Sequence, residues 1–129
     1  MSRHTARRSA VVVACLIVAA CATPLPPAAR VSNLPPLAGT YSGTMKESSR
    51  LARPARIVLQ PDGRFEITVS DPGGFRTVGV LALQQDGALS YSYDVLKGKA
   101  AVYEGDGRRV IVLTQSDGDA IITVEKSLP

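Results

Sequence analysis

Two cysteines are the side chains of this chain best suited to covalent chemistry, and one of them stands at an unusual position. A cysteine reacts as its thiolate, which is a strong nucleophile. Cys21 directly follows an uninterrupted apolar run, residues 10–20, whereas Cys15 lies inside that run. His4, the only histidine, precedes the run. Cys21 is therefore the candidate for a covalent modification.

The apolar run has the features of an export signal. Arg3, Arg7 and Arg8 precede it, which gives the positive-then-apolar order of a signal peptide. As a helix, its length would be about 16 Å, roughly half of a hydrocarbon core that is about 30 Å thick. A buried core helix is the other interpretation, but the run is apolar on every face and is followed by Pro24, Pro26 and Pro27. We therefore predict that residues 1–20 are a signal peptide.

The residues around the cysteine, Val18-Ala19-Ala20-Cys21, resemble the lipobox of bacterial lipoproteins. The resemblance implies that the Cys21 thiol receives a diacylglyceryl group, that the leader is cleaved after Ala20, and that the new amino terminus is acylated. Several acyl chains, at about 0.8 kcal/mol per buried methylene, give stable anchoring to a membrane. Because Ala22 is not an aspartate, the resemblance also implies an outer-membrane address with the domain facing the periplasm.

Removal of the leader would leave few of the side chains that commonly act in catalysis. Three of the 15 Lys and Arg residues lie in the leader, so 12 remain against 11 Asp and Glu, and this near-neutral balance argues against a nucleic-acid partner. The mature chain would hold no histidine, no free thiol and no disulfide. We therefore expect no enzyme, no cofactor and no metal site. The acidic clusters at 104–106 and 117–119 lack calcium-loop spacing, and the pair Arg108-Arg109 is predicted to be a solvated flank of a turn.

Residues 21–36 are rich in proline, with little large apolar content; the prolines are Pro24, Pro26, Pro27, Pro35 and Pro36. Such a composition favours an extended chain of about 3.1 Å per residue, which could hold a domain up to roughly 45 Å from the membrane. We expect this lipidated segment to be a spacer without a fold of its own.

Residues 37–129 consist of short apolar or alternating runs separated by turn residues, at intervals of roughly 9 to 13 residues. The predicted turns are 61–63, 71–74, 86–87, 97–98, 105–107 and 117–118. The predicted strands are 39–46, 55–60, 64–70, 75–84, 88–94, 100–104, 109–115 and 120–126. Closure of about eight sequential strands removes exposed edges. The fold is therefore predicted to be all-β, a small antiparallel up-and-down barrel, with a β-sandwich as the alternative. The apolar runs 110–113 and 120–122 indicate that part of the outer face is covered by the 48–54 loop, the proline-rich segment or a partner.

The start of this domain, Gly39-Thr40-Tyr41, resembles the Gly-x-Trp entry strand of lipocalin-type barrels. The resemblance implies a barrel mouth that takes a small apolar ligand, with Tyr41, Tyr91 and Tyr93 as lining residues. Alternation predicts that Tyr91, Tyr93 and Val95 face inward. The alternative is that the tyrosines fill the interior, because an eight-stranded barrel is only just wide enough for side chains.

The stretch from Lys97-Gly98-Lys99 to Tyr103 resembles the Lys-Gly loop and following strand of the membrane-bound lysozyme inhibitors. That resemblance implies a partner loop in which Lys97 and Lys99 enter an enzyme cleft, and a solvated hairpin turn is the alternative. We expect a non-catalytic binding or interaction module, held on the membrane by its lipid, whose partner is a small apolar ligand or an envelope protein. An inhibitor of a cell-wall-degrading enzyme such as lysozyme, and an enzyme that uses a serine or a carboxylate in the barrel mouth, are the alternatives.

Overall fold

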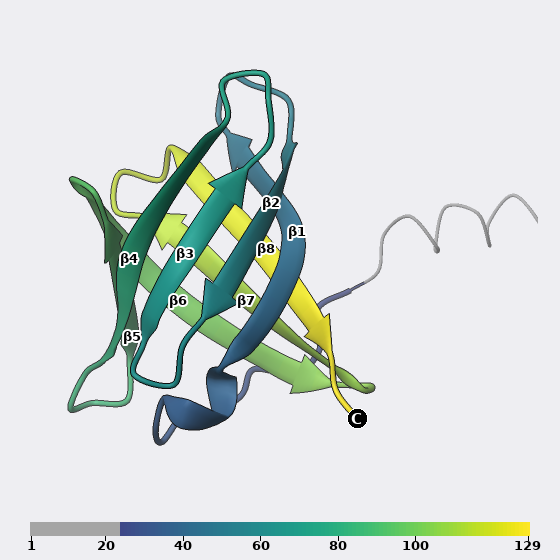
Figure 1. Ribbon diagram of the computed structural model, residues 1–129. Coiled ribbons are helices and arrows are strands. Elements are labelled where there is room, and N and C mark those ends of the chain that lie inside the picture. Colours follow the sequence, from purple (N-terminus) through teal and green to yellow (C-terminus); the bar gives the residue numbers. More distant parts are fainter. Residues whose placement is uncertain (1–23) are drawn as a thin grey trace, which may run out of the picture.

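The computed structural model describes residues 24–129, which form a closed barrel of eight antiparallel strands (Figure 1). Each strand pairs with the next in sequence, and β8 pairs with β1. The strands are β1 (Gly39–Glu47), β2 (Arg53–Leu59), β3 (Arg64–Val69), β4 (Phe75–Leu83), β5 (Leu89–Tyr93), β6 (Leu96–Gly105), β7 (Arg108–Gln115) and β8 (Ala120–Ser127). The prediction of an up-and-down barrel is confirmed, and the sandwich alternative is wrong. Cys21 and the predicted signal peptide, residues 1–20, lie outside the described residues.

Alternation of apolar and polar residues sets which face of each strand is buried. In β3, Phe65, Ile67 and Val69 are buried, whereas Thr68 is exposed. The same period of two places Ile122 and Val124 of β8 in the core. The interior is therefore built from side chains of all eight strands.

Two glycines make room for aromatic rings inside the barrel. A Cβ at Gly98 would lie 2.8 Å from Cε1 of Tyr91, and a Cβ at Gly79 would lie 2.5 Å from Cζ of Phe65. Both glycines take inward positions in their strands, so the rings occupy the space that their side chains would need. The stacked rings of Tyr91 and Tyr93, with centroids 6.0 Å apart, continue this aromatic layer.

The turn between β5 and β6 differs from the prediction. It consists of Asp94 and Val95, and Asp94 adopts a φ of 55°, which aspartate tolerates better than most residues. Val95 is therefore at the tip of the turn and 91% exposed, so the prediction that it faces inward is wrong. Strand β6 begins at Leu96, and the predicted turn at Lys97-Gly98 lies inside that strand.

The proline-rich segment is docked on the barrel over residues 24–36, which contradicts the expectation of a free spacer. Strand β7 pairs with β6 along its length, but β5 pairs with β6 only as far as Ala100. The open side of β6 beyond that point is taken by residues 27–29, because Ala29 N donates to Val102 O at 2.8 Å and Glu104 N donates to Pro27 O at 2.9 Å. The segment then ends in a short 3-10 helix, η1 (Pro35–Leu37), which places Leu37 in the core.

The docked segment also explains part of the covered outer face. Val110 is 1% exposed although alternation puts it on the outside of β7, next to Tyr103 of β6. The segment passes over the end of β6, since Ala28 pairs with Tyr103 and a Cβ at Gly105 would lie 3.1 Å from Pro27. Of the three covers that the sequence left open, the proline-rich segment lies at this position, whereas Ile121 is 42% exposed, so the prediction of a covered outer face is wrong for the run 120–122. No helix within residues 24–129 has the length and apolar character needed to cross a bilayer.

Candidate functional site

One end of the barrel, here called the proximal mouth, is closed by η1 and a buried arginine, Arg109. The side chain of Arg109 is 11% exposed and donates to a Glu104 carboxylate oxygen at 3.1 Å, to Pro36 O at 2.8 Å and to the Tyr41 hydroxyl at 3.4 Å. Burial alone would lower the pKa of Arg109, but its hydrogen bonds to Tyr41 and Glu104 outweigh burial, so the pKa is raised. A permanently charged fork therefore ties strands β6 and β7 to the N-terminal segment.

The opposite end, the distal mouth, is closed by a second inward-facing arginine, Arg53. Its guanidinium donates to the carboxylate of Glu47 and to the backbone oxygens of Pro72 at 3.1 Å and Gly73 at 2.5 Å. Among residues 24–129, buried Arg53 Nε has no hydrogen-bond partner. Arg53 therefore joins the β1–β2 side of the mouth to the loop between β3 and β4.

The interior between the mouths is filled by side chains, and the three predicted ligand-lining tyrosines belong to this filling. Tyr41 is 0% exposed, and Tyr91 and Tyr93 are each 4% exposed. Tyr41 donates its hydroxyl to Leu37 O at 2.6 Å. Burial raises the pKa of all three, and the pKa of Tyr91 reaches about 12 through burial and the nearby Tyr93 and Asp117. The alternative that the tyrosines are core residues is the one that the structure has.

A large hollow lies on the outer surface, over β3, β4 and β5, and we call it the β4 groove. It measures about 920 Å³. Its floor holds Val78 and Val80, which point outward from β4 and are 69% and 47% exposed. Its lining residues are Gln60, Pro61, Asp62, Arg64, Phe65, Glu66, Val78, Gly79, Val80, Ser92, Tyr93 and Asp94. The two valines form a small apolar patch with polar residues around it.

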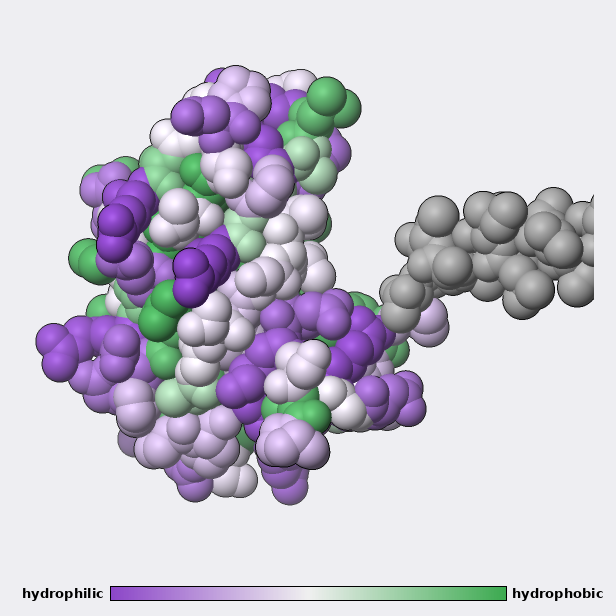
Figure 2. Space-filling view, turned by 45° about the vertical axis from the view of Figure 1, so that its right-hand side comes forward, coloured by the Kyte–Doolittle hydropathy of each residue, from purple (hydrophilic) through white to green (hydrophobic). Residues whose placement is uncertain are grey.

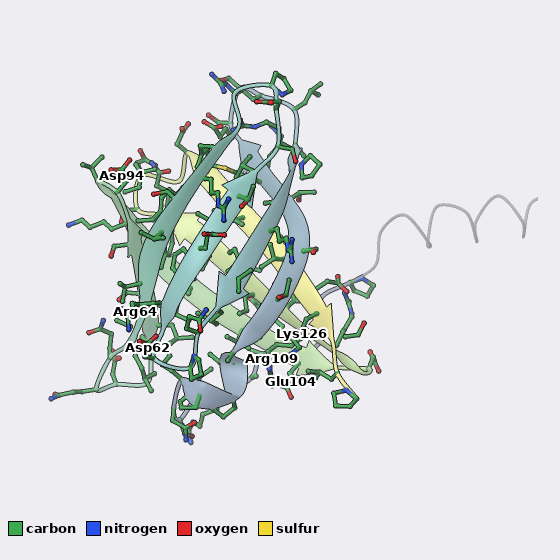
Figure 3. The ribbon with its side chains drawn as sticks, in the orientation of Figure 1. Asp62, Arg64, Asp94, Glu104, Arg109 and Lys126 are labelled. Carbon is green, nitrogen blue, oxygen red and sulfur yellow. The ribbon has the colours of Figure 1, made fainter. Side chains whose placement is uncertain are left out.

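Charged side chains surround these valines. Asp62 accepts hydrogen bonds from the backbone N–H of Arg64 at 3.0 Å and from its Nε at 2.8 Å, and these bonds lower the pKa of the Asp62 carboxyl. Glu66 pairs with Arg76 through two bonds of 3.0 and 3.1 Å. Figure 3 shows Asp62 and Arg64 at one end of the groove and Asp94 towards the other. The lining carries three acidic residues, but Asp62 is paired with Arg64 and Glu66 with Arg76, so within residues 24–129 Asp94 is the one acidic residue of the lining without an ion pair.

The predicted partner loop at Lys97 and Lys99 is not a loop. Both lysines lie in β6 with exposed, outward-facing side chains. They line a smaller hollow of about 290 Å³ on the outer surface over β4, β5 and β6, next to Ser90 and Ser92. The structure therefore brings them near the β4 groove but does not place them on a projecting hairpin.

Sequence reasoning missed both buried arginines. Arg109 shares the inward period with Ile111 and Leu113, and Arg53 shares it with Ala55 and Ile57, so the alternation could have indicated them. The prediction of a solvated turn flank is wrong for Arg109, which is buried, whereas its neighbour Arg108 faces outward. Residues 24–129 bring together no group of three or more His, Cys, Asp or Glu side chains that could hold a metal ion.

The fold is an up-and-down barrel of eight strands with a filled interior, and the β4 groove is a large hollow on its outer surface. Comparisons of the chain with protein-family models, with curated proteins and with solved structures found no match.

Proposed function

We propose that this protein is a lipid-anchored lipoprotein of the outer membrane that faces the periplasm and binds a protein partner, without catalysis, through the β4 groove. The exposed pair Val78 and Val80 carries the proposal, because it is an apolar surface framed by charge. The anchor is supported by the resemblance of Val18-Ala19-Ala20-Cys21 to a lipobox. The filled interior supports binding on the outside of the barrel, since the core leaves no room among Tyr41, Tyr91 and their neighbours.

The lining of the groove indicates the chemistry of the partner. Two apolar side chains in the middle suit a segment that presents aliphatic or aromatic side chains. Asp94 at one end suits a Lys or Arg next to those residues, since complementary charge speeds encounter and rejects wrong partners. The proposed partner is therefore an envelope protein with an apolar segment that has a basic residue at one end.

Photo-cross-linking in the native envelope tests this surface. A benzoylphenylalanine placed at Val80 of the full chain should give a discrete cross-linked product. The matched control places the same residue at Thr44, which is exposed on the outer face of β1. The product at position 80 should fall at least about fivefold on Asp94→Lys, because the substitution replaces attraction by repulsion.

Three results would count against the groove. Equal products at positions 80 and 44 would indicate unspecific contact, and no product at 80 would remove the groove as a binding surface. Insensitivity to Asp94→Lys would exclude the proposed basic partner. The anchor is tested separately, because Cys21→Ala should abolish labelling by palmitate, and continued labelling would reject lipidation at this residue.

A further inference from the structure

The N-terminal segment is fastened to the barrel from its first described residue onward. Pro24 O accepts a hydrogen bond from Arg108, Ala29 and Pro27 pair with β6, and Pro36 O accepts from Arg109. Leu37 is in the core at the far end of the segment. These contacts are spread over all of residues 24–37, so this stretch adds no free length between the barrel and whatever holds the chain before it.

The remaining connection to Cys21 is very short. Only Ala22 and Thr23 separate Cys21 from Pro24. Consecutive Cα atoms are 3.8 Å apart, so the Cα of Cys21 lies at most about 11 Å from that of Pro24. A lipid on Cys21 would therefore hold Pro24 next to the bilayer surface.

The position of Pro24 selects one side of the barrel. Arg108, which holds Pro24, stands at the start of β7 and also pairs with Glu125 of β8 at 3.0 Å. In a closed ring of eight strands β4 lies opposite β8. In Figure 1 the start of the described residues, drawn in purple, accordingly lies on the side away from β4 and β5. The surface near Pro24 and the β4 groove are thus on opposite sides of the molecule.

The surface beside Pro24 is suited to lipid headgroups rather than to acyl chains. In Figure 2, hydrophilic residues predominate on the visible surface around the start of the described residues. Arg108 and Glu125 lie there, and Leu25 is the one exposed large apolar side chain of the docked segment, at 48%. A surface of this kind rests on the headgroup layer, where arginine can also meet phosphate groups.

We infer that the barrel lies directly against the membrane surface, with the proximal parts of β7 and β8 towards the lipid headgroups and the β4 groove facing away from them. This inference rests on the proposed lipidation of Cys21. The extended proline-rich spacer predicted from the sequence would have held the domain tens of ångströms from the membrane. With the segment docked, the barrel instead has a fixed height and orientation above the membrane. The orientation presents the groove to partners on the side opposite the membrane.

Fluorescence quenching on the acylated protein tests this arrangement. The mature chain has no cysteine other than Cys21, so Ser127→Cys on β8 and Ser92→Cys beside the groove can each carry one bimane label. Both serines are exposed, which makes the two variants a matched pair. Each protein, purified from membranes with its lipid, is reconstituted in phosphatidylethanolamine and phosphatidylglycerol vesicles that contain a headgroup nitroxide.

Position 127 should be quenched at least about threefold more than position 92, because the tether reaches only about 11 Å. A control with about twelve Gly and Ser residues inserted between Thr23 and Pro24 should remove this difference, since a flexible linker frees the barrel from the surface.

Each other result has a definite meaning. Equal quenching at the two positions would overturn the orientation, and weak quenching at both would overturn the contact with the membrane. A persistent difference in the lengthened protein would show that the tether does not set the orientation. If the protein does not float with the vesicles and lacks acyl chains by mass spectrometry, both the anchor and this inference are wrong. If the protein floats but the two positions are quenched equally, the orientation alone is wrong and the anchor stands.

Discussion

The two mouths of the barrel use the same residue type in different ways. Arg109 binds chain that is 68 and 73 residues away in sequence, at Tyr41 and Pro36, whereas the partners of Arg53 are only 6 to 20 residues away. Removal of Arg109 should therefore loosen contacts between distant parts of the chain. Removal of Arg53 should loosen one loop. An inward arginine can close a barrel end while its carboxylate and carbonyl partners decide what that closure holds together.

Methionine substitutions at the two arginines should give the largest and most unequal effects. Arg109→Met should lower the free energy of unfolding by roughly 2–4 kcal/mol, since Pro36 O and the Tyr41 hydroxyl lose a charged donor. Arg53→Met should lower it by roughly 1–2 kcal/mol, because the substitution also removes the unpartnered Nε. Urea unfolding of residues 21–129 carrying Cys21→Ala, followed by tyrosine fluorescence, measures the free energy of unfolding of both variants.

The rate of limited trypsin digestion is a second measurement that distinguishes Arg109→Met from Arg53→Met. Arg30 lies in the docked segment, so Arg109→Met should speed cleavage after Arg30, whereas Arg53→Met should leave that rate unchanged. Equal destabilisation together with equal cleavage would show that the two mouths are equivalent.

Alkaline pH should test the core between the mouths. The pKa of Tyr91 is about 12 in the folded chain, against an ordinary value of 10, so the neutral hydroxyl is favoured by folding. The unfolded chain loses this proton first, so stability is fully present below pH 10 and falls as the pH rises from 10 to 12, by roughly 2 kcal/mol for this group. Tyr91→Phe should remove that part of the pH dependence. Unfolding curves at pH 9, 10.5 and 12 measure this for the original protein and for Tyr91→Phe. An equal loss of stability in the two proteins would refute the contribution of Tyr91.

The smallest effect is expected where the segment pairs with β6. Ala29→Pro removes the N–H that bonds to Val102 O, which should lower the free energy of unfolding by about 1 kcal/mol. Ala88→Pro is the matched control for the loss of a backbone donor, because Ala88 N binds only within its own turn, at Asp86. Hydrogen exchange should speed up at Glu104 in the first variant alone, and unchanged exchange there would mean that the pairing does not protect the edge.

The strands could be predicted because each carries a local signal. The period of two, as in Phe65, Ile67 and Val69, and the Gly-containing turns fix most boundaries within two residues. The failure at Lys97-Gly98 has a physical cause, since a glycine inside a strand can also make room for a ring that packs over it. Gly98 lies under Tyr91, while the turn is made by Asp94, a residue type that also reaches positive φ.

The site was harder to predict because its determinants are not local. Arg109 follows the inward period of β7, but its charge suggested solvent, and the partners that make its burial favourable lie at Pro36 and Tyr41. The docking of residues 27–29 depends on where β5 ends, which no pattern within the proline-rich segment reveals. The β4 groove likewise arises from three neighbouring strands, although the outward valines of β4 are visible in the sequence.

The short length of β5 has a consequence for folding. Before residues 27–29 dock, the half of β6 beyond Ala100 presents bare amide and carbonyl groups, which a second copy of the chain could extend into a chain of swapped barrels. The piece that seals this seam has proline at positions 26 and 27, and proline offers no N–H for a further strand. The protein therefore covers the open edge of β6 with a segment whose two prolines cannot donate to a further strand.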